Sequence, residues 1–314
     1  MEPLGSPPTP VPTVAPAPSP TETEAVTYVG GGGRIVFVSD REDGRTLQIW
    51  TMNPDGSDPR QLTFGPGDKT QPRWSPDGSR LLYVAADPGH GLDVWVINAD
   101  GSGATNLTQS LGDDTDPAWS PQGDRIAFTS TRVNDLRQVF VADISCLPMP
   151  ESCSLGRAHN LSAGYAVEYS PAWTHDGLRL AVVASINGAP GRIFFRSLAG
   201  GEPTQFDRSD RLIGADTLDW SPDGTYLAFT WRQPTTTEIY IVPVDHPTQP
   251  VRLTNSLGNK EPAFSPDGGY IVFTSTRDQN PEIYLMSVAG TGQVNLTSYP
   301  GRDMQPDWQP RPGP

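Results

Sequence analysis

The stretch that decides the fold is Glu261–Met286, EPAFSPDGGYIVFTSTRDQNPEIYLM. It contains the turn sequence Phe264–Gly268, in which Pro presets φ, Asp tolerates the next turn position and Gly adopts the left-handed conformation that closes a hairpin. Two apolar runs follow, Ile271–Thr274 and Ile283–Met286. Short, nearly continuous apolar runs are typical of strands that are buried on both faces. The stretch therefore predicts short antiparallel strands joined by tight turns.

The same pattern recurs along the chain from Arg34 onward. The aromatic residues that begin each turn are separated by 45, 54, 47, 44 and 44 residues, and five of the eight tryptophans occupy this position. These residues are Trp74, Trp119, Trp173, Trp220, Phe264 and Trp308. Each unit has two apolar runs, a second turn and a polar strand such as Asn106–Thr108. Four strands in about 45 residues is the period of a β-propeller blade.

The number of predicted strands indicates a closed ring. Arg34–Val38, Gln48–Met52 and Arg60–Thr63 supply three strands of a unit that lacks its first, and Gln305–Trp308 is a first strand alone. Joining them predicts an all-β, six-bladed β-propeller of four-stranded antiparallel blades over residues 34–310. The C-terminal strand closes the ring against the N-terminal blade, which removes free sheet edges.

This pattern resembles the TolB-type, WD-like β-propeller repeat. The shared motifs are Pro-x-Trp-Ser-Pro-Asp-Gly, Ile-x-Phe-Thr-Ser-x-Arg, Glu-Ile-Tyr-x-Met and Asn-Leu-Thr, and Glu261–Met286 matches them almost throughout. The resemblance is to the propeller module, without the α/β domain that precedes it in TolB. It implies a propeller of the bacterial envelope that binds protein partners at its channel mouth. The gating propeller of prolyl-oligopeptidase-type enzymes is also similar, but their hydrolase domain is not matched.

Composition limits the function classes. The chain has 314 residues with 34 Pro and 32 Gly, which excludes a mostly helical fold. Asp and Glu outnumber Lys and Arg by 36 to 22, giving a formal net charge of −14. This balance argues against a nucleic-acid binder or a binder of anionic membranes. No run approaches 18 apolar residues, so we expect no direct membrane insertion. We expect a monomer that binds a protein or peptide.

Residues 1–33 differ in composition from the repeats. Pro-rich sequence fills the first twenty residues and Gly30–Gly33 follows, which favours an extended, disordered linker. Two interpretations remain open: a stalk that holds the propeller away from a membrane or another domain, or a disordered tail. Residues 311–314 are expected to form a short C-terminal tail.

Two faces of the ring are expected to differ. The turns between first and second strands and between third and fourth strands share one face, the turn face, and are uniformly tight. The opposite face, the loop face, carries the variable loops, where repeat proteins usually bind ligands. The candidate ligand-binding residues on this face are Gln71, Asp114, Asp116, Arg132, Tyr169, Asp216, Trp231, Glu261, Arg277 and Gln305.

Some of these candidates recur at the same position of the repeat, and others do not. Arg132 and Arg277 recur at one repeat position, so we expect them to pair with carboxylates of neighbouring loops. Non-repeating residues are better functional candidates: Tyr169, Trp231, Asp114, Asp216 and His90. Trp231 stands where other repeats have small polar residues. It is therefore either an exposed interaction anchor or a side chain packed under a neighbouring loop.

The sequence has few candidate catalytic or metal-binding residues. Only four histidines exist, and their repeat positions are too dispersed for one site; the chain also lacks a Gly-x-Ser-x-Gly elbow. We therefore expect a non-enzymatic protein without a cofactor. Asp113, Asp116 and Glu261 are weak candidates for a Ca²⁺ site. The alternative function is a carbohydrate-active enzyme or glycan-binding propeller that uses channel carboxylates.

The two cysteines lie in the insertion that lengthens one repeat spacing. Cys146 and Cys153 are separated by seven residues within Ser145–Gly156. We expect them to form a disulfide that fixes this insertion. A disulfide favours an extracytoplasmic location, either periplasmic or extracellular on a stalk.

Overall fold

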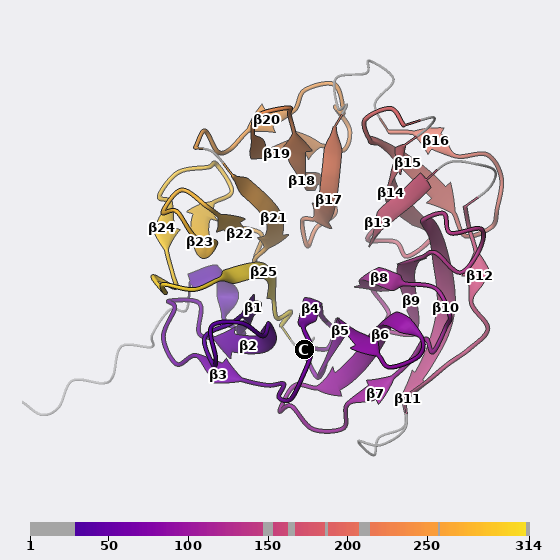
Figure 1. Cartoon of the computed structure of the whole chain (residues 1–314). Helices are drawn as coiled ribbons and strands as arrows, with labels where there is room; N and C mark the ends of the chain where they lie inside the picture. The colour runs from indigo at the N-terminus through magenta and orange to yellow at the C-terminus, as the bar shows by residue number, and fades with distance from the viewer. Residues whose placement is uncertain are drawn as a thin grey trace, which may run out of the picture.

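The computed structural model describes residues 29–146, 153–162, 167–185, 188–206, 214–256 and 258–311. Within these residues, six antiparallel sheets surround a central axis as the blades of a propeller (Figure 1). The predicted all-β, six-bladed ring is confirmed. Residues 1–28 of the expected linker and residues 312–314 of the expected tail lie outside the described residues. Within the described residues, no helix is long and apolar enough to cross a bilayer.

Each blade runs from the axis outward. The first strands are β25 (Asp303–Trp308), β4 (Lys69–Trp74), β8 (Asp114–Trp119), β13 (Val167–Trp173), β17 (Ala215–Trp220) and β21 (Asn259–Phe264). The second strands are β1 (Ile35–Ser39), β5 (Arg80–Asp87), β9 (Arg125–Ser130), β14 (Arg179–Ser185), β18 (Tyr226–Arg232) and β22 (Tyr270–Ser275). We number the blades I to VI in this order.

The outer strands complete the blades. The third strands are β2 (Gln48–Met52), β6 (Gly91–Asn98), β10 (Gln138–Cys146), β15 (Arg192–Ser197), β19 (Thr237–Pro243) and β23 (Glu282–Ser287). The fourth strands are β3 (Arg60–Gln61), β7 (Thr105–Asn106), β12 (His159–Asn160), β16 (Thr204–Gln205), β20 (Val251–Arg252) and β24 (Val294–Asn295). Blade III has an extra strand, β11 (Cys153–Leu155), which pairs with β10 and carries the disulfide between Cys146 and Cys153.

The core lies between neighbouring blades. Each second strand lies between two other strands of its sheet, and the neighbouring blades cover both faces of its apolar run. Phe37, Phe128, Phe229 and Phe273 occupy the same repeat position and are fully buried. Burial of one such side chain stabilises the fold by about 1.5–3 kcal/mol. Repetition of this position therefore gives four of the six blades an equivalent phenylalanine, while blades II and IV have Tyr83 and Val182 there.

The repeated tryptophans join blades at the inner ring. The Trp119 indole donates a hydrogen bond to the Arg73 carbonyl, and the Trp173 indole donates to the Ala118 carbonyl. Trp220 repeats this contact with the preceding blade. An indole supplies a large apolar surface and one donor, so a Trp at this position packs the core and links adjacent first strands.

Both ends of the described chain meet in blade I. β25 pairs with β1, with Ile35 opposite Trp308. The Trp308 indole donates to the Gly32 carbonyl at 2.9 Å. The short 3-10 turn η1 (Val29–Gly31) contains Gly30, where a Cβ atom would lie 2.4 Å from the Trp308 ring. Gly30–Gly33, which we expected in the linker, therefore packs against the ring, and propeller contacts begin earlier than Arg34.

Candidate functional site at the channel mouth

A cavity of about 930 Å³ follows the axis between the two faces. At the turn face it is lined by His175 and by a proline from each of five turns: Pro76, Pro121, Pro222, Pro266 and Pro310. At the loop face its lining includes Gln71, Asp116, Tyr169, Arg232 and Glu261. The first strands surround it (Figure 1). Its size suits a small molecule or a short peptide segment.

All six first strands have a bulge where they enter the channel. In five of them one residue has a positive φ, between 49° and 59°, and each of these residues precedes a proline. Proline disfavours the right-handed helical region for the residue before it and has no N–H for the sheet. The bulge turns the side chain of the residue before the proline along the ring toward the next blade. The five residues are Gln71, Asp116, Ser170, Glu261 and Gln305.

These bulge residues form a belt of hydrogen bonds between blades. The Glu261 carboxylate accepts from the Gln305 N–H at 3.1 Å, and the Gln305 side-chain oxygen accepts from the Gln71 N–H at 2.8 Å. The Gln71 side-chain oxygen then accepts from the Asp116 N–H at 2.7 Å. Asp116 accepts in turn from the Ser170 N–H at 3.5 Å. Four predicted ligand-binding residues, Gln71, Asp116, Glu261 and Gln305, therefore hold the ring together.

The belt is interrupted between blades IV and V. Ser170 is followed in this ring by Thr217, whose N–H donates to the side chain of Asp216 at 3.0 Å. The Thr217 hydroxyl lies 2.6 Å from that of Thr230, and Thr230 accepts from the Glu261 N–H. Among the described residues, no hydrogen bond links Ser170 to Thr217 across this junction. The belt therefore lacks one contact where the non-repeating residues lie, although the Gly214 N–H donates to the Gly191 carbonyl between the same two blades at 2.8 Å.

A cluster of charged and aromatic side chains lines the cavity at this junction. We call Arg137, Tyr169, Asp216 and Arg232 the mouth site. The Arg137 guanidinium lies 5.0 Å from the centre of the Tyr169 ring, a cation–π distance. Arg232 forms an ion pair with Asp216 at 2.5 Å. The mouth site therefore presents two cations, one carboxylate and one phenol to the channel.

Burial and charge alter the acidity of these groups. Burial raises the pKa of Tyr169, and the nearby Asp216 carboxylate raises it further. Burial also raises the pKa of Asp116, which lies beside the mouth site. The hydrogen bond and charge of Asp216 raise the pKa of Arg232. The phenol is therefore a neutral hydrogen-bonding group at physiological pH, suited to recognition.

The repeated arginines have structural partners. Arg132 forms an ion pair with the buried Asp114 at 2.7 Å, as expected for a repeat residue. Asp114 therefore does not face the channel as a free ligand-binding group, contrary to expectation, because the arginine covers it. Arg277 donates to the side-chain oxygen of Asn259 at 3.0 Å. The expected carboxylate partner of Arg277 was wrong, because blade VI has an amide where blade III has an aspartate.

Trp231 lies at the blade V side of the same junction. Its ring is partly buried against Tyr240, with 4.6 Å between ring centres, and it also packs near Gly214. Trp231 replaces a serine that, in blades III and VI, accepts a hydrogen bond from the repeated arginine. Arg232 stands one residue before the repeat position of Arg132 and Arg277, and it pairs with Asp216 at the channel.

The weak Ca²⁺ candidates do not share one set of contacts. The Asp113 carboxylate accepts from the Leu92 N–H at 3.0 Å, beside blade II. Asp116 and Glu261 belong to the belt. Calcium binding by these three residues stays a prediction.

A pair of acids that was not predicted from the sequence lies deeper in the channel. Asp219 and Asp307 line the cavity, together with Arg73. Burial raises the pKa of Asp219 to about 7, with a further contribution from the Asp307 charge, and burial raises the pKa of Asp307 to about 6. A sequence signal existed: all three residues directly precede the anchor tryptophan, and other repeats have alanine there, at Ala118, Ala172 and Ala263.

This acid pair predicts a specific pH dependence of stability. Both pKa values lie above the unfolded value of 3.8. Their contribution to stability is therefore fully present below about pH 4 and is lost as pH rises through about 6 and 7. Asp219→Asn/Asp307→Asn should match wild type at pH 4 and exceed its stability at pH 8. Urea unfolding at both pH values tests this; parallel pH profiles of the two proteins would contradict it.

The closed ring with an axial cavity defines the chain as a six-bladed β-propeller with a potential binding channel. Residues 65–165 and 156–313 match the family described as "TolB beta propeller domain". The chain belongs to this family. Six bulges, five Trp anchors and the closing strand are the features of this chain that carry the fold.

Solved structures with this fold include TolB proteins. TolB from Acinetobacter baumannii is similar with a TM-score of 0.75 and 20% identity, over 89% of this chain and 67% of that chain. A putative TolB from Agrobacterium tumefaciens has a TM-score of 0.61 and 18% identity, over 84% and 88%. A puromycin-hydrolyzing peptidase of Mycobacterium tuberculosis has a TM-score of 0.56 and 18% identity, over 84% of this chain and 43% of that chain. These likenesses show the fold alone.

One curated relative matches a short part of the chain. The "Uncharacterized peptidase YuxL" of Bacillus subtilis is 38% identical over 55 residues. These residues make up 18% of this chain and 8% of that protein. The similarity therefore extends over little more than one blade.

Proposed function

We propose that this propeller is a non-enzymatic module that binds a protein or peptide at the loop face, with the partner entering the channel at the mouth site. The observation that carries the proposal is the interruption of the belt between blades IV and V. Elsewhere the channel entry is occupied by hydrogen bonds between blades. At this junction Arg137, Tyr169 and Arg232 face the cavity without a belt contact across it.

The loop face also exposes large apolar side chains. Phe64, Leu92, Leu111 and Val133 lie on loops or strand ends of this face in blades I to III, and Leu111 is 89% exposed. Exposed apolar side chains beside polar groups are typical of interaction surfaces. The expected partner therefore contacts apolar loops outside the channel and inserts a polar or charged segment at the mouth site.

We also propose an extracytoplasmic location. The support is the disulfide between Cys146 and Cys153, which pins the β10–β11 hairpin. Disulfides persist in oxidising compartments and are rare in the cytosol. A count of free thiols in protein isolated from its native host tests this location: two free thiols per chain would contradict it.

A matched pair of leucines tests the binding face. Leu111 on the loop face and Leu178 on the turn face are 89% and 65% exposed. Leu111→Asp and Arg232→Glu should each weaken partner capture about tenfold, the size expected for loss of an interface anchor. Leu178→Asp should capture the partner like wild type. The measurement is affinity capture from an envelope extract, followed by titration of the identified partner.

The result that contradicts this proposal is equally specific. Loss of binding in Leu178→Asp, with binding retained in Leu111→Asp and Arg232→Glu, would place the partner on the turn face. Thermal unfolding of each variant serves as the folding control, because exposed substitutions usually change stability by less than about 0.5 kcal/mol.

A carbohydrate-active enzyme is the alternative, favoured by one observation. Asp219 has a pKa of about 7 and shares the cavity with Asp307, and glycosidases use one protonated and one ionised carboxyl group. Turnover of a polysaccharide panel by the full chain, lost in both Asp219→Asn and Asp307→Asn, would favour the enzyme. Turnover absent from the wild type leaves the interaction module as the better account.

A further inference from the structure

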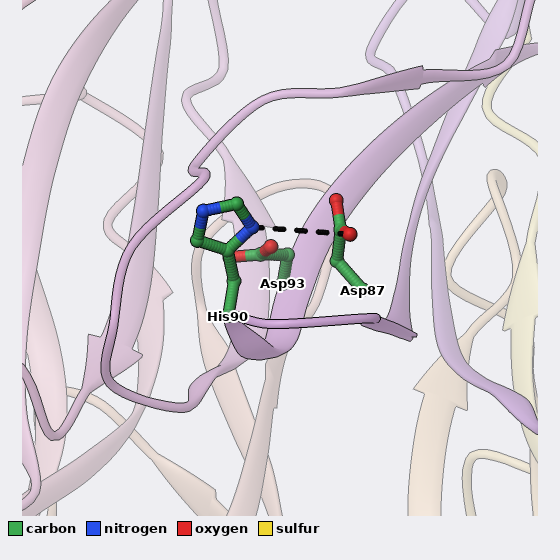
Figure 2. Close-up of side chains that lie close together, drawn as sticks. All are labelled: Asp87, His90 and Asp93. Carbon is green, nitrogen blue, oxygen red and sulfur yellow. Dashed lines mark ion pairs between the residues drawn. The ribbon is translucent and has the colours of Figure 1, made fainter.

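An imidazole and two carboxylates converge at the tip of the β5–β6 hairpin in blade II. The turn Asp87–His90 has Gly89 at φ 102°, and the His90 N–H donates to the Asp87 carbonyl at 3.0 Å. This turn folds the His90 ring back over the hairpin. Its Nδ1 then lies 3.8 Å from Oδ1 of Asp87, and the Asp93 side chain from β6 lies beside both (Figure 2). Ligand-type atoms of the three residues all lie within 4.8 Å of one another.

Hydrogen bonds from the neighbouring strand β7 and the chain after it hold the carboxylates of Asp87 and Asp93 in place. Asn106 on the neighbouring strand β7 donates from one amide nitrogen to Oδ2 of Asp87 at 2.7 Å and to Oδ2 of Asp93 at 2.8 Å. The wholly buried Asp93 also accepts from the Thr108 hydroxyl and the Ser110 N–H. Such outer hydrogen bonds orient the ligands of metal sites. The acids are therefore preorganised without help from His90.

Blade VI shows which features of this cluster belong to the repeat and that His90 is specific to blade II. There Asp278 accepts from the Asn295 amide, and Glu282 occupies the repeat position of Asp93. The Tyr284 hydroxyl donates to Asp278 in that blade. The acid–amide arrangement therefore belongs to the repeat. Blade II differs by placing a histidine over the acids.

The His90 ring nitrogen that faces the acids has no hydrogen-bond partner, and its contact with Asp87 is a long ion pair of 3.8 Å. Nδ1 is buried and makes no hydrogen bond in the described structure, although the ring as a whole is 40% exposed. A buried polar atom without a partner is costly and calls for an explanation. A bound ion between Nδ1 and the carboxylates would satisfy this atom and neutralise the acids.

We propose that Asp87, His90 and Asp93 form a binding site for a divalent first-row transition-metal ion such as Zn²⁺. Imidazole with carboxylates suits Zn²⁺, Cu²⁺ or Ni²⁺, whereas Ca²⁺ and Mg²⁺ take oxygen ligands. A tetrahedral ion with bonds of about 2.1 Å separates its ligand atoms by about 3.4 Å, close to the 3.8 Å between His90 and Asp87. The exposed side of His90 gives the ion access from solvent.

The ion would clamp the hairpin tip beside the loop face. Asp87 ends β5, and Asp93 lies near the start of β6, so a metal bond to each joins the two strands at the end that the turn connects. Leu92, one of the exposed apolar residues of the loop face, lies directly between His90 and Asp93 in sequence. Metal binding therefore orders part of the surface that the proposed function uses, but the site itself stands without that function.

Zn²⁺ titration of the metal-free full chain by calorimetry tests the site. Wild type is expected to bind one equivalent, with binding weakened about 100-fold or more in His90→Ala and in Asp87→Asn. Asn106→Ala should weaken binding about tenfold, because it removes an outer hydrogen bond. Zn²⁺ should raise the melting temperature of wild type and leave that of His90→Ala unchanged. Ca²⁺ should not compete.

Matched controls separate this site from other ligands. Asn295→Ala removes the same repeat residue from blade VI, and His246→Ala removes an exposed histidine; both should bind Zn²⁺ like wild type. Melting temperatures measured without metal show that each variant is folded. Absence of Zn²⁺ binding by wild type, or equal affinity in His90→Ala and wild type, would overturn the proposal.

Discussion

A chain that ends at Arg302 is expected to lose cooperative folding. It lacks β25, and with it the pairing of Ile35 with Trp308 and the ion pair between Arg41 and Asp303 at 2.5 Å. Blade I then has no inner strand, and β1 becomes an exposed edge. Loss of a whole inner strand with the buried Trp308 is expected to remove stability comparable with the total of about 5–15 kcal/mol that is typical of a domain. Urea unfolding followed by tryptophan fluorescence should show no sigmoidal transition.

A graded variant keeps this prediction measurable. Trp308→Ala retains the backbone pairing but empties a buried position, and it should destabilise the fold by about 3–5 kcal/mol. Val251 on the outer strand β20 is exposed, so Val251→Ala is the matched control, with a change below about 0.5 kcal/mol. A truncated chain with the wild-type melting temperature would disprove closure through β25.

Arg196→Met is expected to destabilise the protein by about 3–5 kcal/mol, because it leaves a buried carboxylate without its cation. Arg196 and Glu168 in blade IV are both buried. The Arg196 Nε lies 3.1 Å from each carboxylate oxygen, and its Nη2 also donates to Glu168. Chemical denaturation at neutral pH measures the change.

Two further variants distinguish the buried charge from simple loss of packing. Arg196→Met/Glu168→Gln removes both charges while a glutamine still accepts from the Ser162 hydroxyl, so it should recover at least half of the lost stability. Arg125→Met breaks the solvent-exposed pair with Asp143 and should cost less than about 1 kcal/mol. If Arg196→Met and Arg125→Met lower the free energy of unfolding by the same amount, burial of the ion pair does not contribute to the effect of its loss, and the prediction is wrong.

The architecture was predictable because most blades contain a similar turn sequence, and the residues of that turn determine its structure locally. Each Ser-Pro-Asp-Gly turn depends on its own residues: Ser75 Oγ donates to Asp77 and accepts from the Arg80 N–H, and Gly78 has a φ of 67°. The disulfide between Cys146 and Cys153 also lies within one hairpin. Local causes of this kind can be read from consecutive residues, and they sufficed to count the blades.

The candidate site was less predictable because its determinants cross between blades. Sequence placed Gln71 and Glu261 at the channel, but their hydrogen-bond partners belong to the next blade, so they serve the belt and leave the mouth site to other residues. Arg137 was overlooked, although it covers Tyr169. Asp219 was overlooked because its raised pKa depends on burial and on a residue from another blade.

The meeting of η1 with Trp308 has a consequence for biosynthesis. Among the described strands of the ring, β1 is made before all others, together with the glycines before it, and its partner strand β25 is made after all others. Throughout translation, blade I is therefore a three-stranded sheet with one uncovered apolar edge, while the other blades can assemble in order. Such an edge invites pairing with other nascent chains. Polysomes that translate this chain thus carry their main risk of aggregation at the N-terminal blade, until the final strand emerges.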